Sequence, residues 1–475
     1  MDTIALLSHS SPLGIVAYRS GVAVTAQQFL SDARHLALRL PDSKHVLNVC
    51  ADRYHFTVGL AACLMSQRVS LLPSTHTPQV IAQLAAFAPD AFCLTDDPRC
   101  DIELPQIQYT DQFALPEPPA VPAPFPGPGP APVPAGATES FDVPGIPTTQ
   151  LAAIVFTSGS TGTPVPYKKT WGLLARCIQS GAPRLGLADG RSHTIIGTVP
   201  GQHMYGFEST VLLALLSGNA FSAERPFYPA DVAATVEAVP RPRALVTTPI
   251  HLRTLLTSEV DFPPVDLVIS ATAPLSQELA REVEQKYHTL LLEIYGSTET
   301  GQIAFRRTAD TAAWRLWPGV RLSVSDEQVF AQGGHVEQLT PMCDVIEITG
   351  EEEFLLHGRT ADLINVAGKR SSFGYLNTQL NAIPGVVDGA FFLREGLTGS
   401  TGVARLGAVV VAPGLSAAAL TEHLRQRIDP VFLPRQLLIV EQLPRNATGK
   451  LPQQALQIFA DSHLPDSQLR MDESQ

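Results

Sequence analysis

An apolar run that passes directly into a loop of glycine and hydroxyl residues is the feature that most limits how this chain can fold. Ile154-Val155-Phe156 is typical of the end of a buried strand. Glycines allow a tight turn with exposed N–H groups, and hydroxyls add donors, so such a loop can surround the pyrophosphate of a nucleotide. No Gly-Lys-[Ser/Thr] follows its second glycine, which excludes a Walker P-loop. An ordinary Ser/Gly surface turn is the alternative. The loop residues are Thr157, Ser158, Gly159, Ser160, Thr161 and Gly162.

A second loop of the same kind follows a second apolar run. Residues 290–294 predict another buried strand. An aromatic ring after it can stack on a purine, a threonine hydroxyl can donate to an α-phosphate, and a carboxylate can hold Mg²⁺ against that phosphate. The alternatives are a core tyrosine and a solvated loop carboxylate. The residues in question are Tyr295, Gly296, Ser297, Thr298 and Glu299.

Two further segments follow in order. Asp344 precedes an acidic, strand-rich hairpin that Gly358-Arg359 closes. A buried aspartate can accept both hydroxyls of a ribose, and an arginine nearby can reach ribose or phosphate oxygens. Close to the C-terminus, Lys450 comes directly after a Thr-Gly turn, where a lysine can be directed at developing negative charge. The alternative for Lys450 is an ordinary exposed loop lysine.

These segments resemble the core motifs of the adenylate-forming superfamily, which contains acyl- and aryl-CoA synthetases, adenylation domains and luciferases. Residues 157–164 resemble its phosphate loop, 295–301 its Tyr-Gly-x-Thr-Glu motif, and Asp344 with Arg359 its ribose aspartate and the arginine before its hinge. Lys450 resembles its catalytic lysine. The resemblance covers residues 150–455. Its adenine-side loop, usually richer in glycine, is matched here by Ala271, Thr272 and Ala273.

The resemblance implies a two-step reaction with ATP and Mg²⁺. A carboxylic acid is first converted to an acyl-adenylate with release of pyrophosphate. A thiol, from coenzyme A or from the phosphopantetheine of a carrier protein, then displaces AMP. Thr298, Lys450 and Glu299, as the metal ligand, are expected to stabilise the charge that grows on phosphoryl oxygens. The C-terminal domain is expected to rotate between the steps, about a hinge at Ala361 or Asp362.

Within the superfamily, the segments after the phosphate loop and around 202–206 and 429–434 look like the acid:carrier ligases of aryl-polyene and xanthomonadin-type pigment clusters. Alternatives are a fatty acyl-CoA or acyl-carrier synthetase, an enzyme that stops at the adenylate, and a catalytically silent nucleotide-binding homologue. The phosphate loop departs from the usual pattern, because Val165 stands where a lysine is expected. Lys168 or Lys169 is a candidate replacement, unless no lysine is needed.

The segment around His203 occupies the place of the family's acid pocket. Amino-acid-activating domains usually carry an aspartate one residue later, to hold the substrate ammonium, whereas this chain has Met204. An uncharged pocket suits an acyl or aryl acid, of the hydroxybenzoate or cinnamate type, better than an amino acid. A satisfied core histidine is the alternative for His203.

Composition predicts a cytoplasmic enzyme without nucleic-acid or membrane partners. The net charge of −12 argues against binding to nucleic acid. No segment reaches the roughly 18 consecutive apolar residues of a membrane span, and no signal peptide is evident. The six cysteines are scattered without metal-type pairing, as expected of free thiols in a reducing compartment.

The pattern of apolar residues predicts an α/β fold. Residues 1–358 are expected to form a large N-terminal domain of βα-type sheets with a β-subdomain, and 359–475 a small, mobile α+β C-terminal domain. Residues 116–150, rich in Pro, Ala and Gly, are expected to be an extended connector. Predicted helices span 25–40, 54–65 and 416–428. Predicted strands span 45–50, 68–72, 390–392 and 404–411, with short antiparallel strands over 314–359.

Overall fold

The computed structural model describes residues 2–73, 75–110, 141–158, 164–326, 328–359, 363–366, 369–394, 405–446 and 449–463. The chain forms two compact units, of which the first comprises residues 1–182, 187–194 and 201–224. The second comprises residues 183–186, 195–200 and 225–475. Most of the proline-rich connector and the predicted hinge, Ala361 and Asp362, lie outside the described residues.

The main sheet of the first unit has the strand order β10-β9-β5-β4-β6-β7. Its strands are parallel except β10, which pairs antiparallel with β9. Strands β5 and β6 are buried along their whole length, as their apolar sequences require in a parallel sheet. The bounds are β4 His45–Asn48, β5 Val69–Leu72, β6 Phe92–Thr95, β7 Gln106–Gln108, β9 Leu151–Ser158 and β10 Pro164–Thr170.

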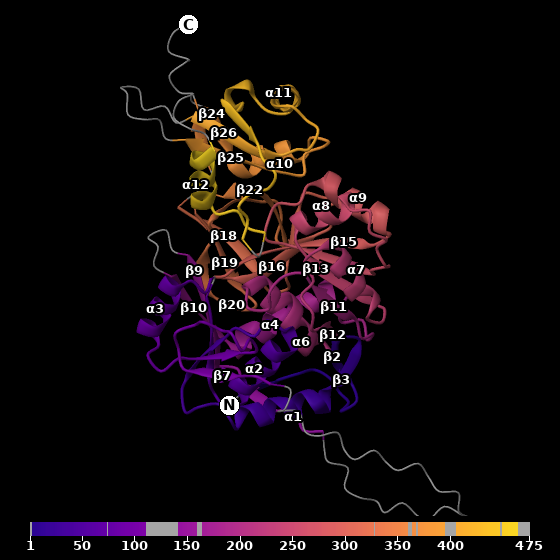
Figure 1. Ribbon diagram of the computed structural model, residues 1–475, viewed down its shortest axis with the longest axis vertical. Coiled ribbons are helices and arrows are strands. Elements are labelled where there is room, and N and C mark those ends of the chain that lie inside the picture. The colour runs from indigo at the N-terminus through magenta and orange to yellow at the C-terminus, as the bar shows by residue number, and fades with distance from the viewer. Residues whose placement is uncertain are drawn as a thin grey trace, which may run out of the picture. The chain divides into compact units, whose positions relative to one another are not determined.

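Smaller elements complete the first unit (Figure 1). Strand β2 pairs with β3 and with β12, and β1 pairs with β8. Their bounds are β1 Thr3–Ala5, β2 Ile15–Arg19, β3 Val22–Thr25, β8 Gly145–Pro147 and β12 Ala220–Ser222. The helices are α1 Ala26–Ala37, α2 Arg53–Met65, α3 Pro78–Phe87, α4 Trp171–Arg184, α5 Met204–Gly206, the π-helix η2 Phe207–Leu212 and α6 Leu213–Ser217.

Local sequence signals set where two of these helices begin. Thr25 caps α1, as predicted, by accepting a hydrogen bond from the backbone N–H of Gln28 at 3.2 Å. Asp52 caps α2 in the same way, through the N–H of His55 at 3.0 Å. The predicted helix over 25–40 is therefore correct in type and ends three residues early.

The second unit is built on a sheet in which the order β21-β22-β17-β16-β15-β14-β13-β11 is continuous. Strands β13, β14 and β15 are parallel, and β16, β17, β22 and β21 follow antiparallel. The bounds are β11 Thr194–Gly197, β13 Arg243–Thr247, β14 Leu267–Ser270, β15 Leu290–Ser297, β16 Gly301–Arg306, β17 Trp314–Leu316, β21 Asp344–Ile348 and β22 Glu353–Arg359. The helices beside them are α7 Pro229–Glu237, α8 Pro249–Thr257 and α9 Gln277–Tyr287.

Three antiparallel strands form a small sheet in the order β18-β19-β20, and β23 pairs with β24. Together with β17, β21 and β22 of the main sheet, β18, β19 and β20 confirm the predicted short antiparallel strands over 314–359. The bounds are β18 Arg321–Ser325, β19 Gln328–Gly333, β20 Val336–Pro341, β23 Leu363–Val366 and β24 Lys369–Ser372.

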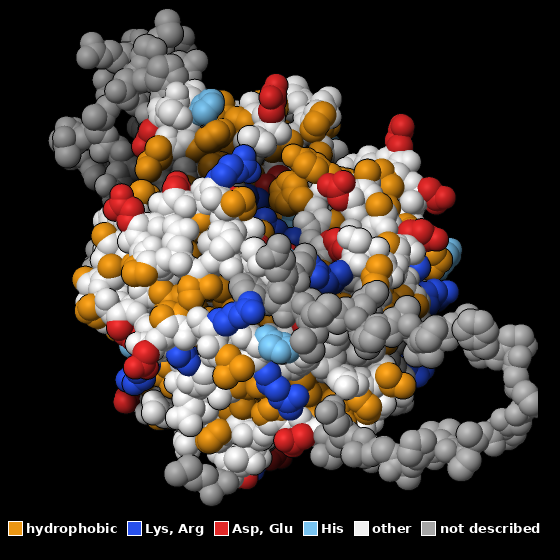
Figure 2. All heavy atoms as spheres, turned by 60° about the horizontal axis from the view of Figure 1, so that its bottom comes forward, with side chains coloured by type: hydrophobic (Ala, Val, Ile, Leu, Met, Phe, Trp, Pro, Cys, Tyr) orange, Lys and Arg blue, Asp and Glu red, His pale blue; other side chains and the backbone are white. Residues whose placement is uncertain are grey.

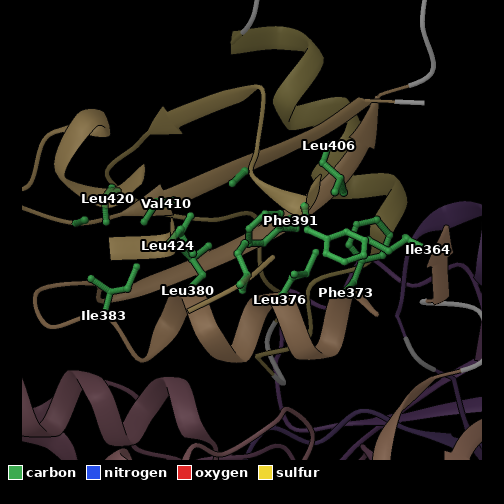
Figure 3. Close-up of a cluster of buried hydrophobic side chains, with 14 residues drawn as sticks. Ile364, Phe373, Leu376, Leu380, Ile383, Phe391, Leu406, Val410, Leu420 and Leu424 are labelled. Atoms are coloured by element: carbon green, nitrogen blue, oxygen red, sulfur yellow. The ribbon is translucent and has the colours of Figure 1, made fainter. Parts of the chain in front are cut away.

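The C-terminal segment has its own core. Strands β25, β26 and β27 form a sheet, and helices pack on it. Figure 3 shows Leu376 and Leu380 pointing from α10 toward Phe391 of β25, and these side chains are fully buried. The bounds are α10 Phe373–Asn381, β25 Asp388–Arg394, β26 Arg405–Val411, α11 Ala417–Arg425, η4 Pro430–Phe432, β27 Gln436–Ile439 and α12 Gln453–His463.

On the face in Figure 2, basic, acidic and apolar side chains of the described residues all occur, separated by uncharged surface. Within the part of the chain that the structure describes, none of the helices combines the length and the apolar character that crossing a membrane requires.

Candidate active site

The parallel strands of the second unit bring three candidate segments to one edge of a sheet. Thr247 of β13 is in register with Ser270 of β14, which is in register with Glu293 of β15. The chain that continues beyond each of these residues therefore leaves the sheet at the same carboxyl edge. Ligands bind at such edges in α/β sheets, because loops and helix N-termini gather there.

The loop after β14 matches the predicted adenine-side segment and is held in an unusual backbone conformation. Ala271 is buried, and Ala273 is half-buried. Thr272 has a φ of 79°, in the left-handed region that favours glycine and strains a β-branched residue. The loop ends at Ser276, whose hydroxyl caps α9 by accepting from the N–H of Leu279 at 3.2 Å.

A buried carboxylate supports this loop from β15. Glu293 is 3% exposed, and its Oε1 accepts the backbone N–H of Leu275 at 3.3 Å. Its Oε2 accepts hydrogen bonds from Arg306 Nε at 2.8 Å and from the hydroxyl of Thr308 at 2.7 Å, and Arg306 Nη2 forms an ion pair with it at 2.7 Å. Burial raises the pKa of the Glu293 carboxyl, and Arg306 opposes that shift most strongly.

The predicted loop over 295–301 is shorter in the structure. Strand β15 runs on through Ser297, because Gly296 and Ser297 pair with Gln302 and Gly301 of β16. A Cβ built on Gly296 would lie 2.2 Å from the carbonyl oxygen of Gly301, so only glycine fits there. The prediction of a loop from Tyr295 was wrong, since antiparallel pairing continues past the parallel part of the sheet.

The turn that joins β15 to β16 contains Thr298 and Glu299, both half-buried. The hydroxyls of Ser297 and Thr300 lie 3.1 Å apart, and the Ser297 hydroxyl accepts the N–H of Thr300 at 3.2 Å. These bonds fix the ends of a short turn. Its threonine and carboxylate are then presented at the edge where the strands end.

Tyr295 links this strand to the predicted ribose carboxylate. Its hydroxyl donates to Asp344 Oδ2 at 2.5 Å, and its ring packs against Trp314 and Phe354 at centroid distances of 5.4 and 5.5 Å. Asp344 of β21 is directly opposite Arg359 of β22 in the antiparallel register. The structure thus brings together the predicted aromatic residue, the aspartate and the backbone of the predicted arginine.

Lys450 ends a compact turn. The N–H of Gly449 donates to the Asn446 carbonyl, the Asn446 N–H to the Lys450 carbonyl, and the Lys450 N–H to Asn446 Oδ1, each at 2.9 Å. Gly449 has a φ of 75°, and a Cβ built on it would lie 3.0 Å from Ile250 Cγ2 and 3.3 Å from Thr248 Oγ1. Glycine therefore allows the turn to contact the start of α8, and Lys450 is exposed beside it.

An arginine and an aspartate fix this turn. Arg445 Nη1 donates to the Gly449 carbonyl at 2.8 Å. Arg445 also forms two bonds to Asp388, Nε to Oδ2 at 2.6 Å and Nη2 to Oδ1 at 2.7 Å. Asp388 is 4% exposed, and Arg253 of α8 lies 3.9 Å from its Oδ1. Such a bidentate pair fixes orientation as well as charge.

Beneath the turn, the start of α8 carries a buried histidine. His251 Nδ1 lies 3.0 Å from the Thr198 hydroxyl and 3.1 Å from the Thr248 hydroxyl. Burial lowers the pKa of His251 to about 4, so the ring is neutral near pH 7.

The remaining predicted residues belong to the first unit. Thr157 is half-buried at the end of β9, Ser158 ends that strand, and residues 159–163 lie outside the described part of the chain. Of the two candidate lysines on β10, Lys168 is exposed and Lys169 is buried.

His203, the predicted pocket histidine, is half-buried and precedes α5. Its neighbour Gln202 donates from Nε2 to the Cys50 carbonyl at 2.5 Å. Met204 and Phe207 are buried at 8% and 0% exposure, as expected of core residues.

Among the described residues, no group of three or more His, Cys, Asp or Glu side chains is arranged to hold a metal ion. Glu299, a half-buried carboxylate in a turn, fits a Mg²⁺ ion that is shared with phosphates, because Mg²⁺ is usually bound by one or two carboxylates together with phosphates and water.

Sequence reasoning missed the groups that hold these loops. Glu293 and Arg306 were not predicted, although one acidic residue inside the apolar run 290–294 was a usable signal. Arg445 stands within the motif that carries Lys450, but nothing local pointed to its partner Asp388, 57 positions away.

Comparison with known families gives two matches. Residues 8–335 match the family described as AMP-binding enzyme, and residues 379–450 match the AMP-binding enzyme C-terminal domain. Among relatives, the 4-coumarate–CoA ligase of Rhodobacter capsulatus is 31% identical over 316 residues, which cover 66% of this chain and 78% of the relative. A 4-chlorobenzoate–CoA ligase of an Arthrobacter species is 26% identical over 382 residues, 70% of each chain.

Solved structures share the fold. ATP-bound MatB from Rhodopseudomonas palustris has a TM-score of 0.77 at 18% identity, with 96% of this chain and 98% of that chain covered. The anthranilate CoA ligase AuaEII in complex with anthranoyl-AMP has a TM-score of 0.76 at 14% identity, with coverages of 97% and 98%. The predicted α/β architecture, a large N-terminal domain followed by a smaller C-terminal domain, is confirmed.

Proposed function

The chain belongs to the AMP-binding enzymes and is an acid–thiol ligase, and from this premise we propose that it activates an aryl or acyl carboxylic acid with ATP and passes the acyl group to a thiol. One observation carries the proposal. The segments after β13, β14 and β15 leave one sheet edge, the Tyr295–Asp344 bond joins β15 to β21 of the same sheet, and the turn of Lys450 contacts the first of these segments at Ile250.

In the first half-reaction, a carboxylate oxygen of the acid attacks the α-phosphorus of ATP. The bond from that phosphorus to the bridging oxygen breaks, pyrophosphate leaves with the electron pair, and an acyl-adenylate remains. The acid is already ionised, so no general base is needed. Lys450 and Thr298 donate to the oxygens on which charge grows. Magnesium, held by Glu299 and phosphate oxygens, would neutralise part of this charge.

The other predicted residues are assigned to binding. Residues Thr157 to Gly162 are proposed as the phosphate loop. Ala271 to Ala273 and Tyr295 are assigned to the adenine, and Gly296 and Ser297 to the nucleotide-binding segment that continues from Tyr295. Asp344 and Arg359 are assigned to the ribose and phosphates, and His203 to the acid. The Tyr295 hydroxyl already occupies one oxygen of Asp344, which orients the carboxylate before a ribose arrives.

In the second half-reaction, a thiol attacks the acyl carbonyl and AMP leaves. Coenzyme A is the first choice of acceptor, because relatives are named CoA ligases. The phosphopantetheine of an acyl carrier protein is the alternative, favoured by the resemblance to pigment-cluster ligases. We propose a domain boundary at 358/359, with rotation at Ala361 or Asp362 between the two half-reactions. All six cysteines are free thiols, which supports a reducing cytoplasm.

The proposed acid is aromatic, of the hydroxybenzoate or cinnamate type. Met204 cannot pair with a substrate ammonium, and the relatives named above act on 4-coumarate and 4-chlorobenzoate. The test is ATP–pyrophosphate exchange with benzoates, cinnamates, medium-length fatty acids and amino acids, followed by thioester formation with coenzyme A or a carrier protein. Preference for an amino acid would overturn the pocket argument. Exchange with none of the acids would support a silent homologue.

A further inference from the structure

One buried ion pair bonds to the adenine-side loop and lies against Trp314, the ring that packs on Tyr295. Glu293 of β15 and Arg306 of β16 are 13 residues apart and are joined by a hydrogen bond from Nε at 2.8 Å and an ion-pair contact of Nη2 at 2.7 Å. Their side chains are 4% and 15% exposed. A pair so well shielded from water is costly to desolvate and is therefore weak evidence for stability alone. The residues that contact this pair indicate a more specific role, in positioning two segments of the site.

On one side, the pair holds the adenine-side loop. Glu293 Oε1 accepts the backbone N–H of Leu275, while its Oε2 is occupied by Arg306 and Thr308. The loop contains Thr272 in the left-handed region, a conformation that persists only where surrounding contacts enforce it. The Glu293 bond is one such contact, made three residues beyond the strained position.

On the other side, the pair reaches the ribose carboxylate through aromatic rings. The Arg306 guanidinium lies 4.3 Å from the centroid of the Trp314 ring. Trp314 packs against Tyr295, and the Tyr295 hydroxyl donates to Asp344. A carboxylate that binds a guanidinium restricts the orientation in which the guanidinium meets a neighbouring indole ring.

We propose that Glu293 and Arg306 are positioning residues for the nucleotide, which set the adenine-side loop and, through Trp314 and Tyr295, the ribose aspartate. The proposal rests on the proposed function, because it presumes that ATP binds at these two segments. It assigns a role in ATP affinity to a buried pair that acts through the Leu275 N–H and the Trp314 ring.

Glu293→Gln tests the proposal. The amide keeps the shape and can still accept from Leu275, but it brings an N–H group where Arg306 and Thr308 both donate. We expect the KM for ATP and the Kd for AMP to rise roughly tenfold, the effect of losing one hydrogen bond to a charged group. The KM for the acid should stay within about twofold. Arg306→Lys, which keeps the charge but removes the guanidinium that lies over the Trp314 ring, should shift the same two constants.

Glu284→Gln is the matched control. Glu284 also accepts one backbone N–H, that of Leu291 at 2.9 Å, and two bonds from an arginine, Arg307, at 3.1 and 2.9 Å. It meets β15 near the start of the strand, away from the edge where the nucleotide segments leave. This variant should lower thermal stability without changing the KM for ATP.

The outcomes separate the two hypotheses. A wild-type protein that binds neither ATP nor AMP in calorimetry would contradict the proposed function. If the wild type binds both and Glu293→Gln and Arg306→Lys bind equally well, the positioning role is wrong. If the two variants raise the constants for ATP and acid alike, or Glu284→Gln matches them, the pair is merely structural.

Discussion

The adenine-side loop and the lysine turn are both held by a carboxylate–arginine pair, but the two pairs are used in opposite ways. In the first, the carboxylate of Glu293 binds the loop, at the N–H of Leu275, and the arginine lies on an aromatic ring. In the second, Arg445 binds the turn at the carbonyl of Gly449, and the carboxylate that pairs with Arg445, Asp388, is buried.

The carboxylates also differ in what they share. Asp388 is approached by two arginines, Arg445 and Arg253, and the second comes from α8 beside the central sheet. Burial lowers the pKa of Arg253, and Asp388 opposes that shift. Glu293 and Arg306 lie on neighbouring strands of one continuous sheet. The turn of Lys450 depends instead on Asp388, which Arg445 shares with Arg253. If the C-terminal domain rotates as proposed, Asp388 and Arg445 move together and the contact with Arg253 breaks.

The largest expected effect comes from removing the lysine itself. Lys450→Ala should slow adenylate formation by 10²- to 10³-fold, about 2.7–4 kcal/mol for one lost donor to the transition state. Thioester formation from a supplied acyl-adenylate should survive, and ATP affinity should change little. Pyrophosphate exchange and single-turnover thiolation measure the two steps. Equal losses in both would show that the lysine serves both half-reactions or only the fold.

Glu299→Gln should affect the nucleotide side instead. We expect a loss of kcat/KM on the order of 100-fold at low Mg²⁺, because a metal ligand is replaced by a neutral group. Excess Mg²⁺ should restore part of the activity. The melting temperature should hardly change, since a half-buried turn carboxylate contributes little to the core. Normal activity of this variant at limiting Mg²⁺ would place the metal elsewhere.

Asp388→Asn should loosen the lysine turn without touching the nucleotide loops. Losing the charge that holds Arg445 should reduce adenylate formation roughly 10- to 100-fold, because a hydrogen bond to a charged group is worth about 1.5–3 kcal/mol. The Kd for AMP should not change, in contrast to Glu293→Gln. A variant that weakens AMP binding as much as catalysis would remove the distinction between the two pairs.

Several strands and loops of the candidate site could be predicted from the sequence, but the two carboxylate–arginine pairs could not. Residues 154–156 and 290–294 are apolar runs, and both lie in strands. Asp344 and Arg359 were predicted to lie at the two ends of one hairpin, and their register confirms it. Glu293 with Arg306, and Asp388 with Arg445, join separate elements, and no local pattern encodes such contacts.

The backbone of the adenine-side loop shows a second limit. A threonine at 272 favours extended backbone by its own propensity, whereas the structure has it at a φ of 79°. Tertiary contacts, among them that of Leu275 with Glu293, outweigh the local preference. The sequence shows only that the expected glycines are missing.

The smallest expected effect concerns stability beneath the lysine turn. The pKa of His251 is lowered from 6.5 to about 4 by burial, so the unfolded chain binds a proton more readily than the folded one between these values. The contribution of the neutral His251 ring to the free energy of unfolding is fully present above pH 6.5 and is lost as the pH falls toward 4. At pH 5.5 the loss is about 1.4 kcal/mol, since the unfolded pKa lies one unit above that pH. His251→Asn keeps an acceptor for the hydroxyls of Thr198 and Thr248 but takes up no proton. Urea unfolding at pH 7.5 and 5.5 should therefore show a smaller acid loss in this variant than in the wild type. An identical loss in both would mean that other buried groups, such as His9, whose pKa burial also lowers, account for the acid sensitivity.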